Sequence, residues 1–168
     1  MKSQIRFNKP ITFALLQTYL ALMAGDSITL DYFTELTTFK EGTYREVINL
    51  IKDMINDLRL KTNLQRLETD VSTNKTEYVT YRYEFSSTDS YDFEIPEDLS
   101  EEKRITYLPV VTYLKLKKRQ YVSWDRLTKY IPTITPKVFM NLIAGLKNVI
   151  GEELYKNELQ SYVIEEIE

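Results

Sequence analysis

The chain has 168 residues, with 22 basic and 25 acidic side chains, and its net charge is −3 at pH 7 with a pI near 5.2. It contains no cysteine and no histidine. Disulfides, thiolate catalysis and cysteine metal sites are therefore excluded, and the commonest general base and zinc ligand is absent. We accordingly expect no enzyme activity, no metal site and no cofactor.

The N-terminal segment superficially resembles a secretory signal, because basic residues precede an apolar run over residues 11–24. Gln17 and Thr18 interrupt this run, and its apolar residues follow helical spacing. We therefore predict a buried first helix that begins at Pro10 and ends before Gly25. Since no stretch reaches the ~20 apolar residues of a membrane span, we expect a cytoplasmic protein.

The stretch 42–58 predicts a long amphipathic helix. Thr43 and Glu46 have the spacing of a capping box at its start. A shorter helix over 30–37, capped by Thr29, is predicted before it. The apolar positions of the long helix form one stripe: Tyr44, Val47, Ile48, Ile51, Met54, Ile55 and Leu58.

After residue 60 the periodicity changes from helical to alternating. Residues 64–71 and 76–85 favour two strands, and the turn sequence 72–75 joins them into a hairpin. Residues 86–102 then hold seven acidic side chains and no basic one. We interpret this segment as a solvated linker that becomes helical from Ser100, a serine cap followed by two glutamates.

The first pattern then returns. Thr18-Tyr19-Leu20 recurs 94 positions later as Thr112-Tyr113-Leu114. At the same offset Ile28 aligns with Val122, and Thr29 aligns with Ser123. With one residue inserted, the stripe of the long helix matches a second predicted helix, whose apolar positions are Phe139, Leu142, Ile143, Leu146 and Ile150.

Thr135 as cap and Pro136 in the first turn predict the start of this second long helix, which spans 136–150. A short, acidic second hairpin is expected over 154–167. The predicted fold is mainly α with small β-hairpins, arranged as two tandem winged-helix domains. Their expected bounds are 1–85 and 105–168, with an acidic linker over 86–104.

The segment 28–36, followed by Gly42-Thr43-Tyr44-Arg45, resembles bacterial winged-helix transcription regulators of the DeoR type. The tandem arrangement is similar to the N-terminal half of Mga-type virulence regulators. This resemblance implies a DNA-binding transcription regulator, or the DNA-binding region of one, whose third helices enter DNA grooves. Glu46 and Asp53 depart from the basic and small polar residues that those families show on this helix.

Charge is divided unevenly along the chain. Residues 103–147 hold ten basic side chains against Asp125 alone, a net charge of +9, although the whole chain is acidic. A basic segment of this kind favours a phosphate-bearing partner. The alternative is that the segment neutralises the acidic linker or tail.

The outward faces of the two long helices supply most of the candidate contacts. Asparagine and arginine can read base edges, and lysines beside them can contact phosphates. The candidate DNA-binding residues are Thr43, Arg45, Asn49, Lys52, Lys117, Lys118, Arg119, Lys137, Asn141 and Lys147. The expected partner is double-stranded DNA, with homodimerisation left open and no membrane association.

Two alternative functions share the predicted architecture. Tandem winged helices in chromosome-condensation accessory subunits bind proteins, and the low pI of this chain together with Glu46 and Asp53 favours such a protein-interaction module. A plasmid or phage replication initiator has the same arrangement of elements. The basic segment 103–147 favours DNA over a protein partner.

Overall fold

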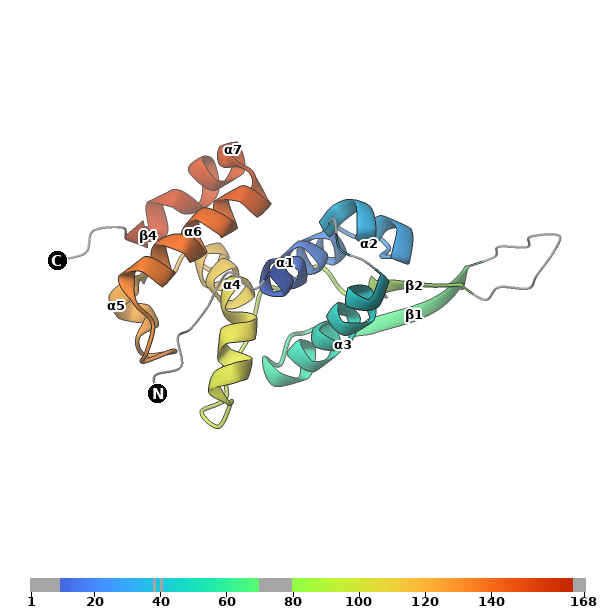
Figure 1. Ribbon diagram of the computed structural model, residues 1–168, viewed down its shortest axis with the longest axis horizontal. Helices are drawn as coiled ribbons and strands as arrows, with labels where there is room; N and C mark the ends of the chain where they lie inside the picture. The colour runs from blue at the N-terminus through green and yellow to red at the C-terminus, as the bar shows by residue number, and fades with distance from the viewer. Residues whose placement is uncertain (1–9, 38, 40, 70–79, 165–168) are drawn as a thin grey trace. The chain divides into compact units, whose positions relative to one another are not determined.

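The computed structural model describes residues 10–37, 39, 41–69 and 80–164. It is mainly helical with a small antiparallel two-stranded sheet, as the sequence predicted (Figure 1). The helices are α1 (Pro10–Met23), α2 (Leu30–Thr37), α3 (Glu41–Asp57), α4 (Glu101–Lys117), α5 (Trp124–Leu127), α6 (Pro136–Ile150) and α7 (Glu152–Leu154). The strands are β1 (Leu64–Thr69), β2 (Thr80–Phe85), β3 (Val122–Ser123) and β4 (Val163–Ile164).

The chain divides into two compact units. A continuous unit spans Gln17–Glu94, and a discontinuous unit combines Met1–Leu16 with Ile95–Glu168. One division therefore falls inside α1, between Leu16 and Gln17, and the other falls between Glu94 and Ile95.

The acidic segment after β2 is attached to the continuous unit. The Glu94 amide donates to the Leu58 carbonyl at 2.8 Å, and the Glu94 carboxylate lies 2.9 Å from the Arg59 guanidinium. Asp92 forms a second ion pair with Lys61 at 3.1 Å. Residues 92–94 thus lie along the end of α3 and neutralise basic residues there, so this part of the predicted linker is not a free connection.

In the continuous unit, a strand-like residue between α1 and α2 joins the hairpin. The Ile28 amide donates to the Tyr83 carbonyl at 2.8 Å, and the Tyr83 amide donates back at 2.9 Å. β1 and β2 pair antiparallel from Leu64 opposite Phe85 to Thr69 opposite Thr80, while the predicted turn 72–75 lies outside the described residues. The hairpin was therefore predicted correctly over its described part.

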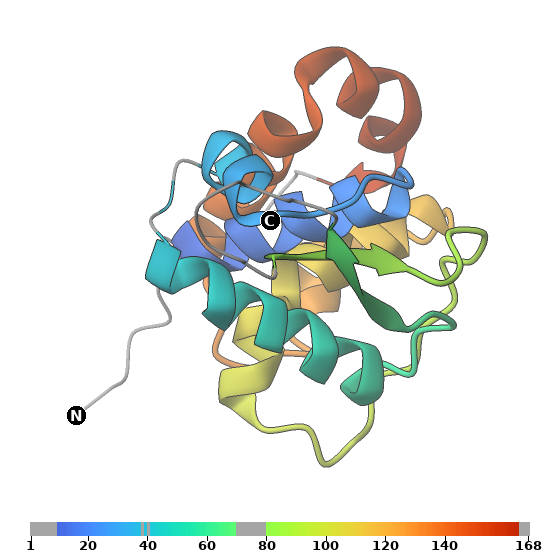
Figure 2. The same cartoon turned by 90° about the vertical axis from the view of Figure 1, so that its right-hand side faces the viewer.

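The long helix α3 lies beside this hairpin (Figure 2). Its predicted stripe is confirmed: Val47, Ile51 and Met54 are fully buried. Tyr44, at the start of the stripe, is half-buried and packs between Phe33 of α2 and Tyr83 of β2. The capping box predicted at Thr43 is wrong, because α3 begins at Glu41 and places Thr43 inside the first turn.

Positions paired by the repeat carry the same backbone hydrogen bonds. The Gly25 amide donates to the Leu22 carbonyl at 3.1 Å, and 94 positions on the Arg119 amide donates to the Leu116 carbonyl at 3.0 Å. Both residues have positive φ, 88° for Gly25 and 60° for Arg119. The helices α1 and α4 therefore end in the same left-handed turn, although only one of them has glycine there.

The other four predicted helix caps, at Thr29, Ser100, Ser123 and Thr135, are confirmed. Thr29 Oγ1 accepts from the Tyr32 amide at 3.2 Å, and Ser123 Oγ accepts from the Arg126 amide at 3.1 Å. Thr135 caps α6 through the Val138 amide at 3.2 Å, and Ser100 caps α4 through the Lys103 amide. A side-chain acceptor placed before a helix satisfies an amide that has no partner within the helix. The N-terminal ends of these helices can therefore be predicted from the sequence.

In the discontinuous unit, α4 and α6 supply the core. Leu142 and Leu146 of α6 are fully buried, as are Leu108 and Val111 of α4. Residues 10–16 of α1 belong to the same unit, and Phe13 packs against Gly145 of α6. This close approach is available because glycine has no Cβ.

The second predicted hairpin is wrong. After α6 the chain forms α7, then a π turn over Tyr155–Leu159 and a 3-10 turn over Gln160–Tyr162. Tyr155 and Leu159, four residues apart, are both buried and hold this segment on the core as a helix. Within the described residues the segment ends in β4, which pairs parallel with β3 through Val122 opposite Val163.

Candidate nucleic-acid interface

The outer face of α6 is the clearest candidate surface. One face of α6 is buried in the core, so the opposite face is turned toward solvent, and Met140 on that face is 61% exposed. The exposed residues of this α6 face are Lys137, Met140, Asn141, Ala144, Lys147 and Asn148. It has two cations and no acidic side chain, and a small residue lies near its centre, so a polyanion can approach it closely.

The outer face of α3 differs in charge. Arg45, Asn49 and Lys52 are exposed as predicted, but Glu46 and Asp53 are exposed on the same face. Thr43 is half-buried. The Lys52 ammonium lies 5.7 Å from the centre of the Tyr83 ring, which ties it to the hairpin. This face therefore offers mixed charge, in contrast to α6.

The basic end of α4 is only partly available to a ligand. The Lys117 ammonium lies 3.6 Å from the Glu158 carboxylate, whereas Lys118 and Arg119 are exposed. Burial and the nearby Arg126 guanidinium lower the pKa of the half-buried Lys115. Burial and a neighbouring cation both disfavour the charged form of this lysine.

Sequence reasoning missed a group of aromatic residues beside this basic end. Tyr121 is 51% exposed, and its ring lies 5.6 Å from that of Tyr162. The Arg126 guanidinium lies 5.9 Å from the centre of the Tyr121 ring. Tyr121 and Arg126 are close in sequence, so their proximity could have been predicted. Tyr162 is distant in sequence and reaches them only because β3 pairs with β4.

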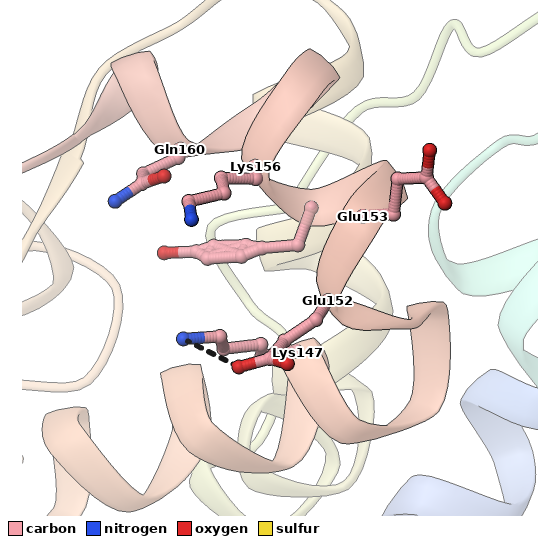
Figure 3. Close-up of a pocket in the computed structure, with 6 residues that line it drawn as sticks. Lys147, Glu152, Glu153, Lys156 and Gln160 are labelled. Carbon is pink, nitrogen blue, oxygen red and sulfur yellow. Dashed lines mark ion pairs between the residues drawn. The ribbon is translucent and has the colours of Figure 1, made fainter.

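Sequence reasoning also missed a cavity of about 340 Å³ beside the C-terminal end of α6 (Figure 3). Lys147, which was predicted, contributes to its wall, and Lys156 was not predicted. The lining residues are Lys147, Glu152, Glu153, Tyr155, Lys156 and Gln160. The helical segment 152–162, which replaces the second hairpin, therefore has two neighbours. Lys156 and Gln160 line the cavity beside Lys147 of α6, and Glu158 forms an ion pair with Lys117 of α4.

The ten predicted residues fall into both units. Thr43, Arg45, Asn49 and Lys52 lie in the continuous unit, and the other six lie in the discontinuous unit. Among the described residues, no group of three or more acidic side chains is placed to hold a metal ion, and no helix is long and apolar enough to cross a bilayer. No protein-family model, curated protein or solved structure matches this chain.

Proposed function

We propose that the chain is a DNA-binding transcriptional regulator, or the DNA-binding region of one, built from two winged-helix units. In this proposal α3 and α6 are the third helices of the two units, and α6 is the principal reader of DNA. The observation that carries the proposal is the outer face of α6, where Lys137, Asn141 and Lys147 are exposed and the helix itself carries no acidic side chain. The nearest acid, Glu152, lies just past the end of α6 and forms a loose ion pair with Lys147.

The order of elements in the continuous unit supports a winged helix. A bridge at Ile28, two helices and a hairpin follow the first helix in turn, and Ile28 pairs with β2. The discontinuous unit repeats the helix end and the cap of the continuous unit 94 positions later, at Arg119 and Ser123. The same bonds at positions 94 residues apart support two units of the same construction.

Asn141 is the residue best suited to read a base. Its amide can pair bidentately with adenine, and its exposed place on α6 keeps it clear of the core. Lys137 and Lys147 lie on the same face at its two ends and suit phosphate contacts or guanine. Ala144 between them leaves room for the duplex edge.

Titration with duplex DNA tests the proposal. A preferred sequence is first selected from randomised duplexes, and affinity is then measured by fluorescence anisotropy at several salt concentrations. Asn141→Ala is expected to cost about 1–3 kcal/mol on the selected sequence and little on random DNA. Lys129→Ala, an exposed lysine away from α6, is the matched control.

A protein-interaction module is the second candidate, and the outer face of α3 favours it. Glu46 and Asp53 would repel phosphates there, while Met140 on α6 is the most exposed of the large apolar residues described. This candidate predicts no salt-dependent affinity for DNA. If the wild-type protein shows no salt-dependent affinity for DNA, the proposed regulator is wrong and the interaction module is the better explanation.

A further inference from the structure

The segment that follows α6 brings distant residues to one place. Gly151, with φ of 100°, ends α6 and redirects the chain, so that Lys156 and Gln160 return beside Lys147. Figure 3 shows the polar ends of Lys147, Lys156 and Gln160 on the same side of the cavity. We call these three residues the polar row.

The acidic residues of the cavity leave the polar row cationic. Glu152 forms a loose ion pair with Lys147 at 3.7 Å, while Glu153 points to the opposite side (Figure 3). The ion pairs found among the described residues do not include Lys156. Two ammonium groups and one carboxylate leave a net charge of +1 on the row.

The buried ring of Tyr155 fixes the geometry of the row. Tyr155 is 2% exposed, and the Lys147 ammonium lies 5.6 Å from the centre of its ring. Lys156 follows Tyr155 directly, and Leu159, also buried, holds the turn that carries Gln160. The backbone beneath the row is thus anchored in the core, and a ligand does not have to order it.

We infer that the polar row binds a phosphate group. Two ammonium groups and a side-chain amide supply donors and positive charge on one side of an open cavity, which is the chemistry that phosphate oxygens require. Lys147 belongs also to the outer face of α6. Under the proposed function, on which this step rests, the phosphate is therefore a phosphodiester of the strand that α6 reads. The helical segment after α6 then grips the DNA backbone in place of the hairpin that the sequence predicted.

Three single variants test the DNA source of the phosphate. Lys156→Ala should lower affinity about eightfold at 0.1 M salt and reduce the slope of log affinity against log salt by about 0.9, equally on selected and random DNA. Gln160→Ala should lower affinity without changing the slope, because no counterion is released at an amide. Lys129→Ala, which removes the same charge elsewhere, should leave the slope unchanged.

The outcomes separate this inference from the proposed function. If wild-type protein binds and Asn141→Ala weakens it, but Lys156→Ala behaves like Lys129→Ala, the polar row is overturned and the regulator stands. If wild-type protein binds no DNA, the proposed regulator function is wrong. A titration with inorganic phosphate followed by NMR then shows whether the polar row binds phosphate. Shifts of the Gln160 side-chain amide and Lys156 backbone amide, lost in Lys156→Ala, would support a site for a free phosphate compound. Their absence would overturn the site.

Discussion

The ring of Phe13 occupies the place where a side chain of Gly145 would begin. A Cβ atom built on Gly145 would lie well inside van der Waals contact with the ring atoms Cζ and Cε1 of Phe13. α1 and α6 therefore approach each other at a glycine in the middle of a helix, where alanine would otherwise be favoured by about 1 kcal/mol.

Gly145→Ala should consequently change stability with opposite sign in two backgrounds. In the wild-type chain the added methyl displaces Phe13, and an overpacking cost of about 2 kcal/mol exceeds the gain of about 1 kcal/mol in helix propensity. The free energy of unfolding should therefore fall by about 1 kcal/mol. In a Phe13→Ala background the same change should raise it by about 1 kcal/mol. Urea unfolding of the four proteins measures the coupling, and an equal effect in both backgrounds would contradict the packing.

Ile48 of α3 and Ile143 of α6, which the sequence repeat pairs, are both buried in the core. They are 3% and 5% exposed, as the repeat predicted. Truncation of either to alanine should lower the free energy of unfolding by about 2–5 kcal/mol, measured by urea denaturation. Met140→Ala on the exposed face of α6 should cost far less, and losses below about 1 kcal/mol at both isoleucines would show that the stripes do not pack.

The caps at Thr29 and Ser123 should be equivalent in energy. Thr29→Ala and Ser123→Ala should each lower the free energy of unfolding by about 1 kcal/mol, because an amide in the first turn loses its acceptor. Thr29→Ser keeps the hydroxyl and serves as the control. If thermal unfolding shows Thr29→Ser and Thr29→Ala to be equally destabilised, the methyl group and not the cap stabilises α2.

Tyr44 should make the continuous unit sensitive to alkaline pH. Burial, and then the neighbouring Tyr83, raise the pKa of Tyr44 from 10.0 to about 12. The folded chain therefore binds this proton more tightly than the unfolded chain, so the stabilisation is present below pH 10 and is lost between pH 10 and 12. Urea titrations between pH 10 and 12 should show a smaller fall in the free energy of unfolding for Tyr44→Phe than for the wild-type chain. Tyr81→Phe, on the exposed part of β2, should leave the fall unchanged.

The basic end of α4 should contact phosphates without reading sequence. The ion pair between Lys117 and Glu158 makes charge reversal at Lys117 a test of folding as well as of binding, so neutral changes are preferable. Lys118→Gln with Arg119→Gln should weaken binding to selected and random duplexes alike and reduce the salt slope by up to about 1.8. If these residues only neutralise acidic segments, anisotropy titrations at two salt concentrations will show no change in DNA affinity.

Local signals in the sequence predicted much of the fold. The stripes of α3 and α6 and the caps at Ser123 and Thr135 depend on residues within one or two turns of each other, so they are readable without the rest of the chain. The outward faces followed from the same geometry. Asn49 and Asn141 are exposed because each lies on the side of its helix opposite the buried stripe.

The parts that sequence reasoning missed depend on contacts between distant residues. The acidic, Gly151-led segment after α6 was interpreted as a hairpin, although Tyr155 and Leu159 already had helical spacing. Lys156 meets Lys147 only because the chain reverses at Gly151, and no local pattern reports that reversal. The partnership of Phe13 with Gly145 spans most of the sequence and is visible only in three dimensions.

The division of the chain within α1 has a consequence for the order of folding during synthesis. The continuous unit, Gln17–Glu94, has all its residues available once residue 94 has left the ribosome. The discontinuous unit cannot close until α6 emerges, because Phe13 has to wait for Gly145. The two units therefore mature at different times, and the slower one depends on a contact of long sequence separation. A nascent chain stalled near residue 140, with residue 94 outside the ribosome and Gly145 not yet added, should hold one protease-resistant unit and expose the other.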